Sequence, residues 1–113
     1  MRKNKDGLKF DKGKPRLDLI PPEAIFALGE VLSYGEKKYG SRNWEKGMDY
    51  GRVFGATQRH LWKYWQGVDK DHESKLDHLY HALANTAFLI AFHERSIGKD
   101  TRSKVSGKAK FKT

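Results

Sequence analysis

The fold is set by residues 77–92, DHLYHALANTAFLIAF. Leucine, phenylalanine and alanine recur here at intervals of three and four residues, the spacing that gathers side chains on one face of a helix. The second half, 82–92, is apolar on nearly every side, and a helix without a polar face must be buried all round. Three helices of one chain can barely enclose such a helix. The stretch therefore predicts an all-α bundle of three to four helices, completed by oligomerisation.

Two helices are predicted upstream. Pro21 and Pro22 precede a helix over 23–39, and Gly40 is placed to cap its C-terminus. A second helix covers 52–66 and ends before Gly67. The third begins near Ser74, which serves as its N-cap, and runs to about residue 93.

Apolar spacing predicts which helix faces form the core. The residues expected inside are Ile25, Leu28, Leu32 and Tyr39 from the first helix, and Val53, Phe54, Leu61 and Trp65 from the second. Residues 41–51 form a loop pinned by the indole of Trp44.

Length and composition exclude several classes of protein. A chain of 113 residues has room for one domain, and without cysteine it can build neither a disulfide framework nor a thiolate metal site. Any metal must use carboxylates, imidazoles and carbonyls, and oxygen-rich sites suit Mg²⁺ or Mn²⁺.

The apolar run 87–92 is too short to span a bilayer and no signal-peptide segment is present, so we expect a cytoplasmic protein with no membrane partner.

The net charge of +9 is concentrated at the two ends of the chain. Residues 1–19 and 94–113 hold 14 of the 23 basic residues and 5 of the 14 acidic residues, which leaves the middle neutral. We therefore divide the chain into an extended basic segment, 1–20, a helical catalytic domain, 21–95, and a basic, largely disordered tail, 96–113. Nucleic acid is not the expected partner. A nucleic-acid or host-binding module acting through these tails, with Trp62, Tyr64 and Trp65 nearby, is the weaker alternative.

A polar stripe on the third helix is the first candidate site. Asp77, His78, His81 and Asn85 share one strip that continues into apolar residues. Polar groups entering a core need partners, which a metal ion or a phosphate would supply. Hydrogen bonds among the four residues themselves explain the stripe equally well.

Further carboxylates and cations extend this stripe. Glu73 and Asp77 lie four residues apart and form a candidate metal-binding pair; the alternative is that they cap the helix N-terminus. Glu30 on the first helix is a candidate ligand that faces the third helix; the alternative is that it is a simple surface residue. Lys38 ends the first helix, where a cation complements the dipole or binds phosphate. Arg59 either clamps phosphate or packs across an indole. Since no nucleophile motif or phosphate-binding glycine loop occurs, metal-assisted hydrolysis is the remaining chemistry.

Three ordered motifs resemble a known family. They are KFDKGKPRLDLIPPEA at 9–24, YGEKKYGSRNWEKG at 34–47, and the series RH at 59–60, DHES at 71–74 and DHLYHA at 77–82. As a set they resemble the dATP/dGTP diphosphohydrolases found mostly in phages, which are related to the MazG-like all-α nucleoside triphosphate pyrophosphohydrolases. The resemblance covers residues 9–92.

The resemblance implies an activity. A MazG-like helical protein, assembled as a dimer or tetramer in the host cytoplasm, would hydrolyse dGTP or dATP to the deoxynucleoside monophosphate and pyrophosphate with Mg²⁺ or Mn²⁺. The paired-glutamate helix and Glu-x-x-Asp helix of the wider superfamily are not intact here, and Lys75 stands where glycine is expected. The implied catalytic residues are Glu30, Glu73 and Asp77, with His81 as a fourth metal ligand. The implied substrate-binding residues are Lys14, Arg16, Lys38, Tyr39, Asn43, Trp44, Arg59, His78 and Asn85.

A different helical phosphohydrolase is the main alternative. His60, His78 and His81 would be metal ligands in an HD-type enzyme, although the chain lacks a His-Asp dipeptide. Release of inorganic triphosphate in place of pyrophosphate would identify it.

Overall fold

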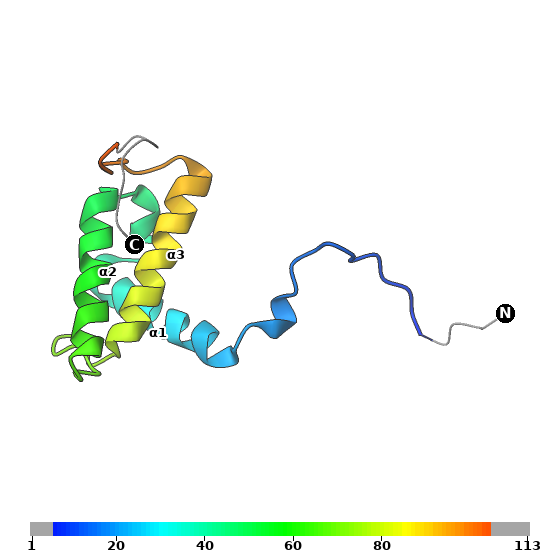
Figure 1. Cartoon of the computed structure of the whole chain (residues 1–113), viewed down its shortest axis with the longest axis horizontal. Coiled ribbons are helices and arrows are strands. Elements are labelled where there is room, and N and C mark those ends of the chain that lie inside the picture. The colour runs from blue at the N-terminus through cyan, green and yellow to red at the C-terminus, as the bar shows by residue number, and fades with distance from the viewer. Residues whose placement is uncertain (1–5, 105–113) are drawn as a thin grey trace, which may run out of the picture.

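A computed structural model describes residues 6–104 as a bundle of three α-helices (Figure 1). They are α1 (Pro22–Tyr39), α2 (Tyr50–Trp65) and α3 (His78–Arg95), and two short 3₁₀ helices, η1 (Leu17–Leu19) and η2 (Asn43–Lys46), lie before and after α1. α3 packs against both α1 and α2. The described residues contain no strand, so the predicted all-α fold is confirmed.

The ends of α1 follow the prediction closely. Pro22 occupies the first helical turn, where its missing N–H leaves no bond unmade. At the other end, Gly40 adopts φ +93° and donates its N–H to the carbonyl of Glu36 at 2.9 Å. The predicted glycine cap is confirmed.

The other two helices begin elsewhere than predicted. α2 starts at Tyr50, two residues early, and the N–H of Gly51 bonds to the hydroxyl of Thr101 at 2.8 Å. α3 starts at His78, so the prediction of an N-cap at Ser74 is wrong. The reason is the backbone of Lys75, which has a left-handed φ of +65° that interrupts a helix. Ser74 instead accepts the N–H of Leu76 at 3.1 Å.

The core is built mainly from small residues around one phenylalanine. Phe92 and Ala84 of α3 are fully buried, and Ala27, Val31 and Val53 are almost so. Beside them the ring of Trp44 stacks on Phe88 with centroids 5.1 Å apart, and Tyr50 stacks on Phe92 at 6.1 Å. The prediction that Trp44 pins its loop is confirmed.

Several bulky residues expected in the core lie outside it. Phe54 is 58% exposed and Trp65 is 77% exposed, and Ile25, Leu32 and Tyr39 also face outward. α3 is not buried all round either, since Leu83 and Ile90 are exposed. The inner faces belong to Ala27 and Val31 in α1 and to Val53 and Thr57 in α2, because small side chains allow the closer approach of helices. Within residues 6–104 of the single chain, the bulkier side chains therefore stay exposed.

The segment after α3 returns to the start of α2. The N–H of Tyr50 bonds to the carbonyl of Lys99 at 2.9 Å, and the N–H of Lys99 bonds to the carbonyl of Met48 at 3.2 Å. Two glycines make this approach possible. Gly47 has φ +85°, and a Cβ built there would lie 2.5 Å from the backbone nitrogen of Gly98. The end of the predicted tail, 105–113, lies outside the described residues.

Residues 6–20 form an arm that projects from the N-terminus of α1 away from the bundle (Figure 1). Every residue of this arm is exposed, including Leu8, Phe10, Leu17 and Leu19. Within the described part of the chain, no helix has the length and apolar character needed to cross a membrane.

Candidate active site

Polar side chains from all three helices gather where α2 ends and α3 begins. The loop between these helices, residues 66–77, supplies part of the group. Its members are joined by hydrogen bonds, ring contacts or an ion pair: Tyr34 and Lys38 from α1, His60 from α2, Asp71, Glu73 and Ser74 from the loop, and His78 and His81 from α3. We call this group the polar cluster.

Three histidines form its centre. The Nδ1 atoms of His60 and His78 are 2.8 Å apart, so one ring donates a hydrogen bond to the other. The ring of His81 stacks on His60 with centroids 4.7 Å apart and an interplanar angle of 12°. Ser74 Oγ lies 2.7 Å from His81 Nε2 and fixes the orientation of that ring.

The surroundings keep the rings of His60 and His81 neutral. Burial and the neighbouring imidazoles lower the pKa of His60 to about 4, and burial lowers the pKa of His81. A neutral imidazole has one nitrogen lone pair free to accept a proton or bind a metal ion. Near neutral pH, the rings of His60 and His81 therefore offer ligand atoms and carry little positive charge.

Asp71 is oriented by its own loop. Its Oδ2 atom accepts the N–H of Glu73 at 3.1 Å and the N–H of Ser74 at 2.9 Å. Although burial raises the pKa of Asp71, these hydrogen bonds from Ser74 and Glu73 outweigh it and leave the pKa below its usual value. The carboxylate is thus ionised and fixed in direction.

Hydrogen bonds also fix the loop onto α3. The N–H of Asp71 bonds to the carbonyl of Leu76, and the N–H of His78 bonds to the carbonyl of Asp69, both at 2.8 Å. As a result His60, Asp71 and His78 each offer a ligand atom, and the three atoms lie within 4.8 Å of one another. Two imidazoles and a carboxylate at this separation suit a divalent metal ion.

Glu73 and Lys38 form an ion pair at the α1 side of the cluster. The hydroxyl of Tyr34 also donates to Glu73 at 3.1 Å, and the Tyr34 ring meets the edge of His81 with centroids 6.3 Å apart. The hydrogen bonds from Lys38 and Tyr34 hold the pKa of Glu73 below its usual range, and the same ion pair raises the pKa of Lys38. Both groups are charged at neutral pH.

A cavity of about 450 Å³ opens beside His60, Asp71 and His78. Its wall carries three cations, Arg59, Lys63 and Lys70. Cationic side chains next to metal-ligand atoms form a surface that suits a polyphosphate, because phosphate oxygens bind both cationic side chains and metal ions.

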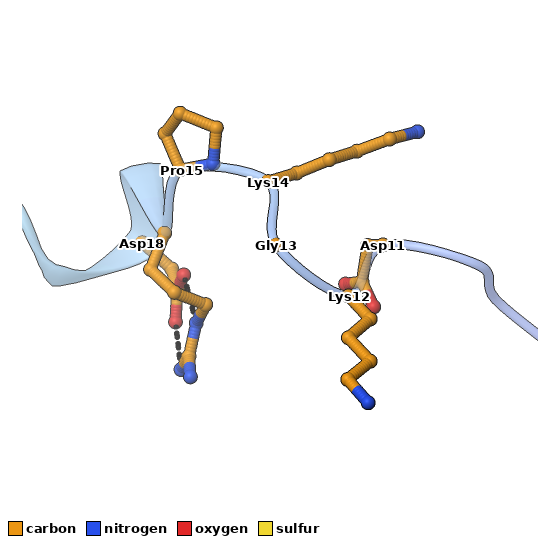
Figure 2. Close-up of a pocket in the computed structure, with 7 residues that line it drawn as sticks. Asp11, Lys12, Gly13, Lys14, Pro15 and Asp18 are labelled. Atoms are coloured by element: carbon orange, nitrogen blue, oxygen red, sulfur yellow. Dashed lines mark hydrogen bonds and ion pairs between the residues drawn. The ribbon is translucent and has the colours of Figure 1, made fainter.

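A larger hollow, of about 580 Å³, lies on the arm between Asp11 and Asp18. Figure 2 shows its wall: the side chains of Lys12 and Lys14 point in different directions, and Asp18 is bonded to a guanidinium group. That group belongs to Arg16, whose nitrogens lie 2.9 and 2.8 Å from the carboxylate oxygens. Lys14 and Arg16 line this hollow on the arm, and the arm projects away from the bundle (Figure 1).

The four metal ligands predicted from the sequence do not all belong to the polar cluster. Glu73 and His81 belong to the polar cluster. Glu30 is exposed one turn before Tyr34 and makes no hydrogen bond or ion pair with the described residues. Asp77 is the N-cap residue of α3, and its side chain makes no capping bond.

Of the predicted substrate-binding residues, some lie at the polar cluster or its cavity and others do not. His78 and Lys38 belong to the cluster, Arg59 lines the cavity, and the ring of Tyr39 lies under the Lys38 ammonium at 5.2 Å. The others lie elsewhere: Asn43 and Trp44 on η2, where the Trp44 indole contacts Phe88 and Arg95, and half-buried Asn85 one turn beyond His81.

Spacing along the sequence does not join Asp71 to His60 and His78, nor does it place Lys63 and Lys70 near them. Eighteen residues separate the two histidines, so only the packing of α2 on α3 brings them together. One local signal was available: Asp71 precedes Ser74 by three residues, a spacing at which an aspartate accepts backbone N–H groups.

The chain matches the family model described as "dATP/dGTP diphosphohydrolase, N-terminal" over residues 4–102. It belongs to this family. The resemblance noted in the sequence is confirmed. A relative named dATP/dGTP diphosphohydrolase, from Salmonella phage PMBT28, is 39% identical over 84 residues, which cover 74% of this chain and 29% of the relative. The chain therefore spans less than a third of the length of that relative. No solved structure matches the chain significantly.

Proposed function

We propose that this chain is a metal-dependent pyrophosphohydrolase that converts a purine deoxynucleoside triphosphate, dGTP or dATP, to the monophosphate and pyrophosphate. The observation that carries the proposal is the cavity in which Arg59, Lys63 and Lys70 lie beside His60, Asp71 and His78. Membership of the diphosphohydrolase family, and the name of the phage relative, support the choice of substrate.

The cations of the cavity bind the triphosphate. Their side chains neutralise the phosphate oxygens and hold the chain of phosphates along the wall. A divalent ion, Mg²⁺ or Mn²⁺, would lower the pKa of a water molecule and shield the phosphorus that the water attacks. Glu30, Glu73, Asp77 and His81 remain the ligand set that the resemblance implies for it.

Glu73 is our candidate general base, in place of the metal-ligand role that the resemblance implies for it. Because Lys38 and Tyr34 keep its carboxylate ionised, it can accept a proton from water at neutral pH. The water oxygen bonds to the α-phosphorus, the bond to the bridging oxygen breaks, and pyrophosphate leaves with both electrons of that bond. Lys38 fixes the carboxylate that receives the proton.

Tyr39 is the better placed of two candidates for stacking on the base. It is 60% exposed and adjoins the ion pair of Lys38 with Glu73, whereas one face of Trp44 already packs on Phe88. The unpartnered side chains of Trp65, Leu83 and Ile90 support a homo-oligomer, dimer or tetramer, in the cytoplasm of the host cell.

The test is product analysis. The purified chain with Mn²⁺ is incubated with each of the four common deoxynucleoside triphosphates, and the products are separated by chromatography. We expect monophosphate and pyrophosphate from the purine substrates. Glu73→Gln should slow the reaction by about 10²-fold or more, the usual contribution of a general base. Glu94→Gln, which changes an exposed carboxylate near the end of α3, is the control. The absence of pyrophosphate with all four substrates refutes the proposal.

One observation favours a second candidate. His60, His78 and His81, the ligands expected of an HD-type phosphohydrolase, are brought together by the fold. Such an enzyme would release inorganic triphosphate and the nucleoside. The same chromatography separates the two reactions.

A further inference from the structure

His60 Nδ1 and His78 Nδ1 face each other and can bind a metal ion, a role that the proposed hydrolysis by Glu73 and the cavity cations does not use. The 2.8 Å contact of His60 Nδ1 with His78 Nδ1 has room for a single proton, which one ring donates to the other. If each ring carries its proton on Nε2, both Nδ1 lone pairs point into the same space. A cation other than a proton can then bridge them.

The separation of these nitrogens fits an ion of transition-metal size. Bonds of about 2.1 Å that meet at a right angle place two nitrogen ligands about 3 Å apart. The observed 2.8 Å requires little movement of either helix. The ligand atom of the Asp71 carboxylate lies within 4.8 Å of both nitrogens, which makes Asp71 the third ligand of the group.

Neighbouring groups hold the three residues in place. Both backbone N–H groups that bond to Asp71 reach the same oxygen, Oδ2, and so fix the direction of the carboxylate. The ring of His81 covers one face of His60 and is itself oriented by Ser74. Supporting contacts of this kind fix the direction of metal ligands and strengthen binding.

We infer that His60, Asp71 and His78 form a three-ligand centre for a first-row transition-metal ion, in preference to Mg²⁺. Two imidazoles and one carboxylate suit Mn²⁺, Fe²⁺, Co²⁺ and Zn²⁺, whereas Mg²⁺ requires oxygen ligands and retains its waters. The three residues also line the cavity of about 450 Å³. The remaining coordination positions therefore face the space where the cations Arg59, Lys63 and Lys70 lie, open to water or phosphate.

The catalytic meaning of this centre rests on the proposed function, but its existence is tested without nucleotide. The full chain is stripped of metal and titrated with Co²⁺ or Mn²⁺ by calorimetry, and the visible absorption of Co²⁺ reports histidine ligation. We expect one ion per centre, a rise in melting temperature with Co²⁺, and no comparable rise with Mg²⁺.

Two variants remove ligands with little change of shape, His60→Gln and Asp71→Asn. Each should weaken Co²⁺ binding by more than the 10- to 100-fold that loss of a supporting residue produces. His93→Gln and Asp69→Asn, which change exposed side chains of the same types, should bind as the natural chain does. Circular dichroism of each metal-free variant checks that it is folded.

Three results would overturn the inference: no binding of Co²⁺ or Mn²⁺, unaltered binding in both ligand variants, or Mg²⁺ binding as tight as that of Co²⁺. These outcomes are separate from those of the hydrolysis assay. Ion binding that follows the expected variant pattern without pyrophosphate release keeps the centre and refutes the proposed function. Pyrophosphate release with unaltered ion binding in the variants keeps the proposed function and refutes the metal centre.

Discussion

Gly47→Ala is expected to lower the free energy of unfolding by about 3 kcal/mol. Gly47 has φ +85° and ψ 156°, a backbone conformation that is almost restricted to glycine and that costs other residues about 1–3 kcal/mol. The added methyl group would also lie 2.5 Å from the backbone nitrogen of Gly98 and 2.7 Å from its Cα. Because both atoms belong to the backbone, the segment after α3 must move.

That movement breaks the contacts that join residues 97–101 to the start of α2. The bonds at risk are Tyr50 N–H to the Lys99 carbonyl and Lys99 N–H to the Met48 carbonyl. Each contributes about 0.5–1.5 kcal/mol net, and together with the backbone strain they give the total above. In a domain of this size, about 3 kcal/mol corresponds to a fall in melting temperature of more than about 10 °C.

The assay is chemical and thermal denaturation followed by circular dichroism. Gly29→Ala is the matched control, since no heavy atom lies within 4 Å of its added Cβ and its helical backbone suits alanine. We expect that variant to gain about 0.5–1 kcal/mol. If Gly47→Ala loses less than about 1 kcal/mol, the interpretation of the glycine contact is wrong.

Three other predictions concern the polar cluster and the loop that carries part of it. Lys75→Gly should raise stability by up to about 1 kcal/mol, because lysine has φ +65° where glycine has no steric penalty; unchanged or lower stability in denaturation would contradict this. In chelator, the melting temperature should fall as pH drops from about 6.5 to about 4, since unfolded histidine binds a proton in this range and His60 does not. His60→Gln should flatten that dependence, and an equally steep curve would rule out His60 as its source. Lys38→Met should slow hydrolysis while changing stability little, as expected for an exposed ion pair. Lys37→Met is its control, and equal losses of activity in the two variants would argue against a special role for Lys38.

Helix type and number followed from the sequence because they depend on local spacing and caps. Proline at the start of α1 and Gly40 at its end are signals that act within a few residues. The start of α3 was misplaced because a serine followed three residues later by aspartate resembles a capping motif. The left-handed backbone of Lys75 between them is set by hydrogen bonds of the loop, such as that from Lys75 N–H to the Asp71 carbonyl at 2.9 Å.

The core faces were harder to predict for a physical reason. α1 and α2 each carry bulky apolar residues on more than one face, and spacing alone does not say which face packs in one chain. Val31 and Val53 are buried, while Phe54 and Trp65 remain exposed.

Part of the candidate site could be predicted from local spacing, and part of it depends on how the helices pack. His78 and His81 share a strip that the helical period predicts, and both belong to the polar cluster. The approach of His60 to His78 and the proximity of Lys63 and Lys70 to the same cavity arise only when α2 lies against α3. Tertiary proximity of this kind leaves no trace in local spacing.

Because α3 contributes to both the core and the polar cluster, its rotation about its own axis must suit both. The same rigid helix carries His78 and His81 toward α2 and the loop, and Ala84 and Phe92 into the core. Inserting or deleting one residue between His81 and Ala84 would turn the two ends by about 100° relative to each other. Either the core or the histidines would then face the wrong way, so length changes in this stretch are excluded even where most single substitutions are tolerated.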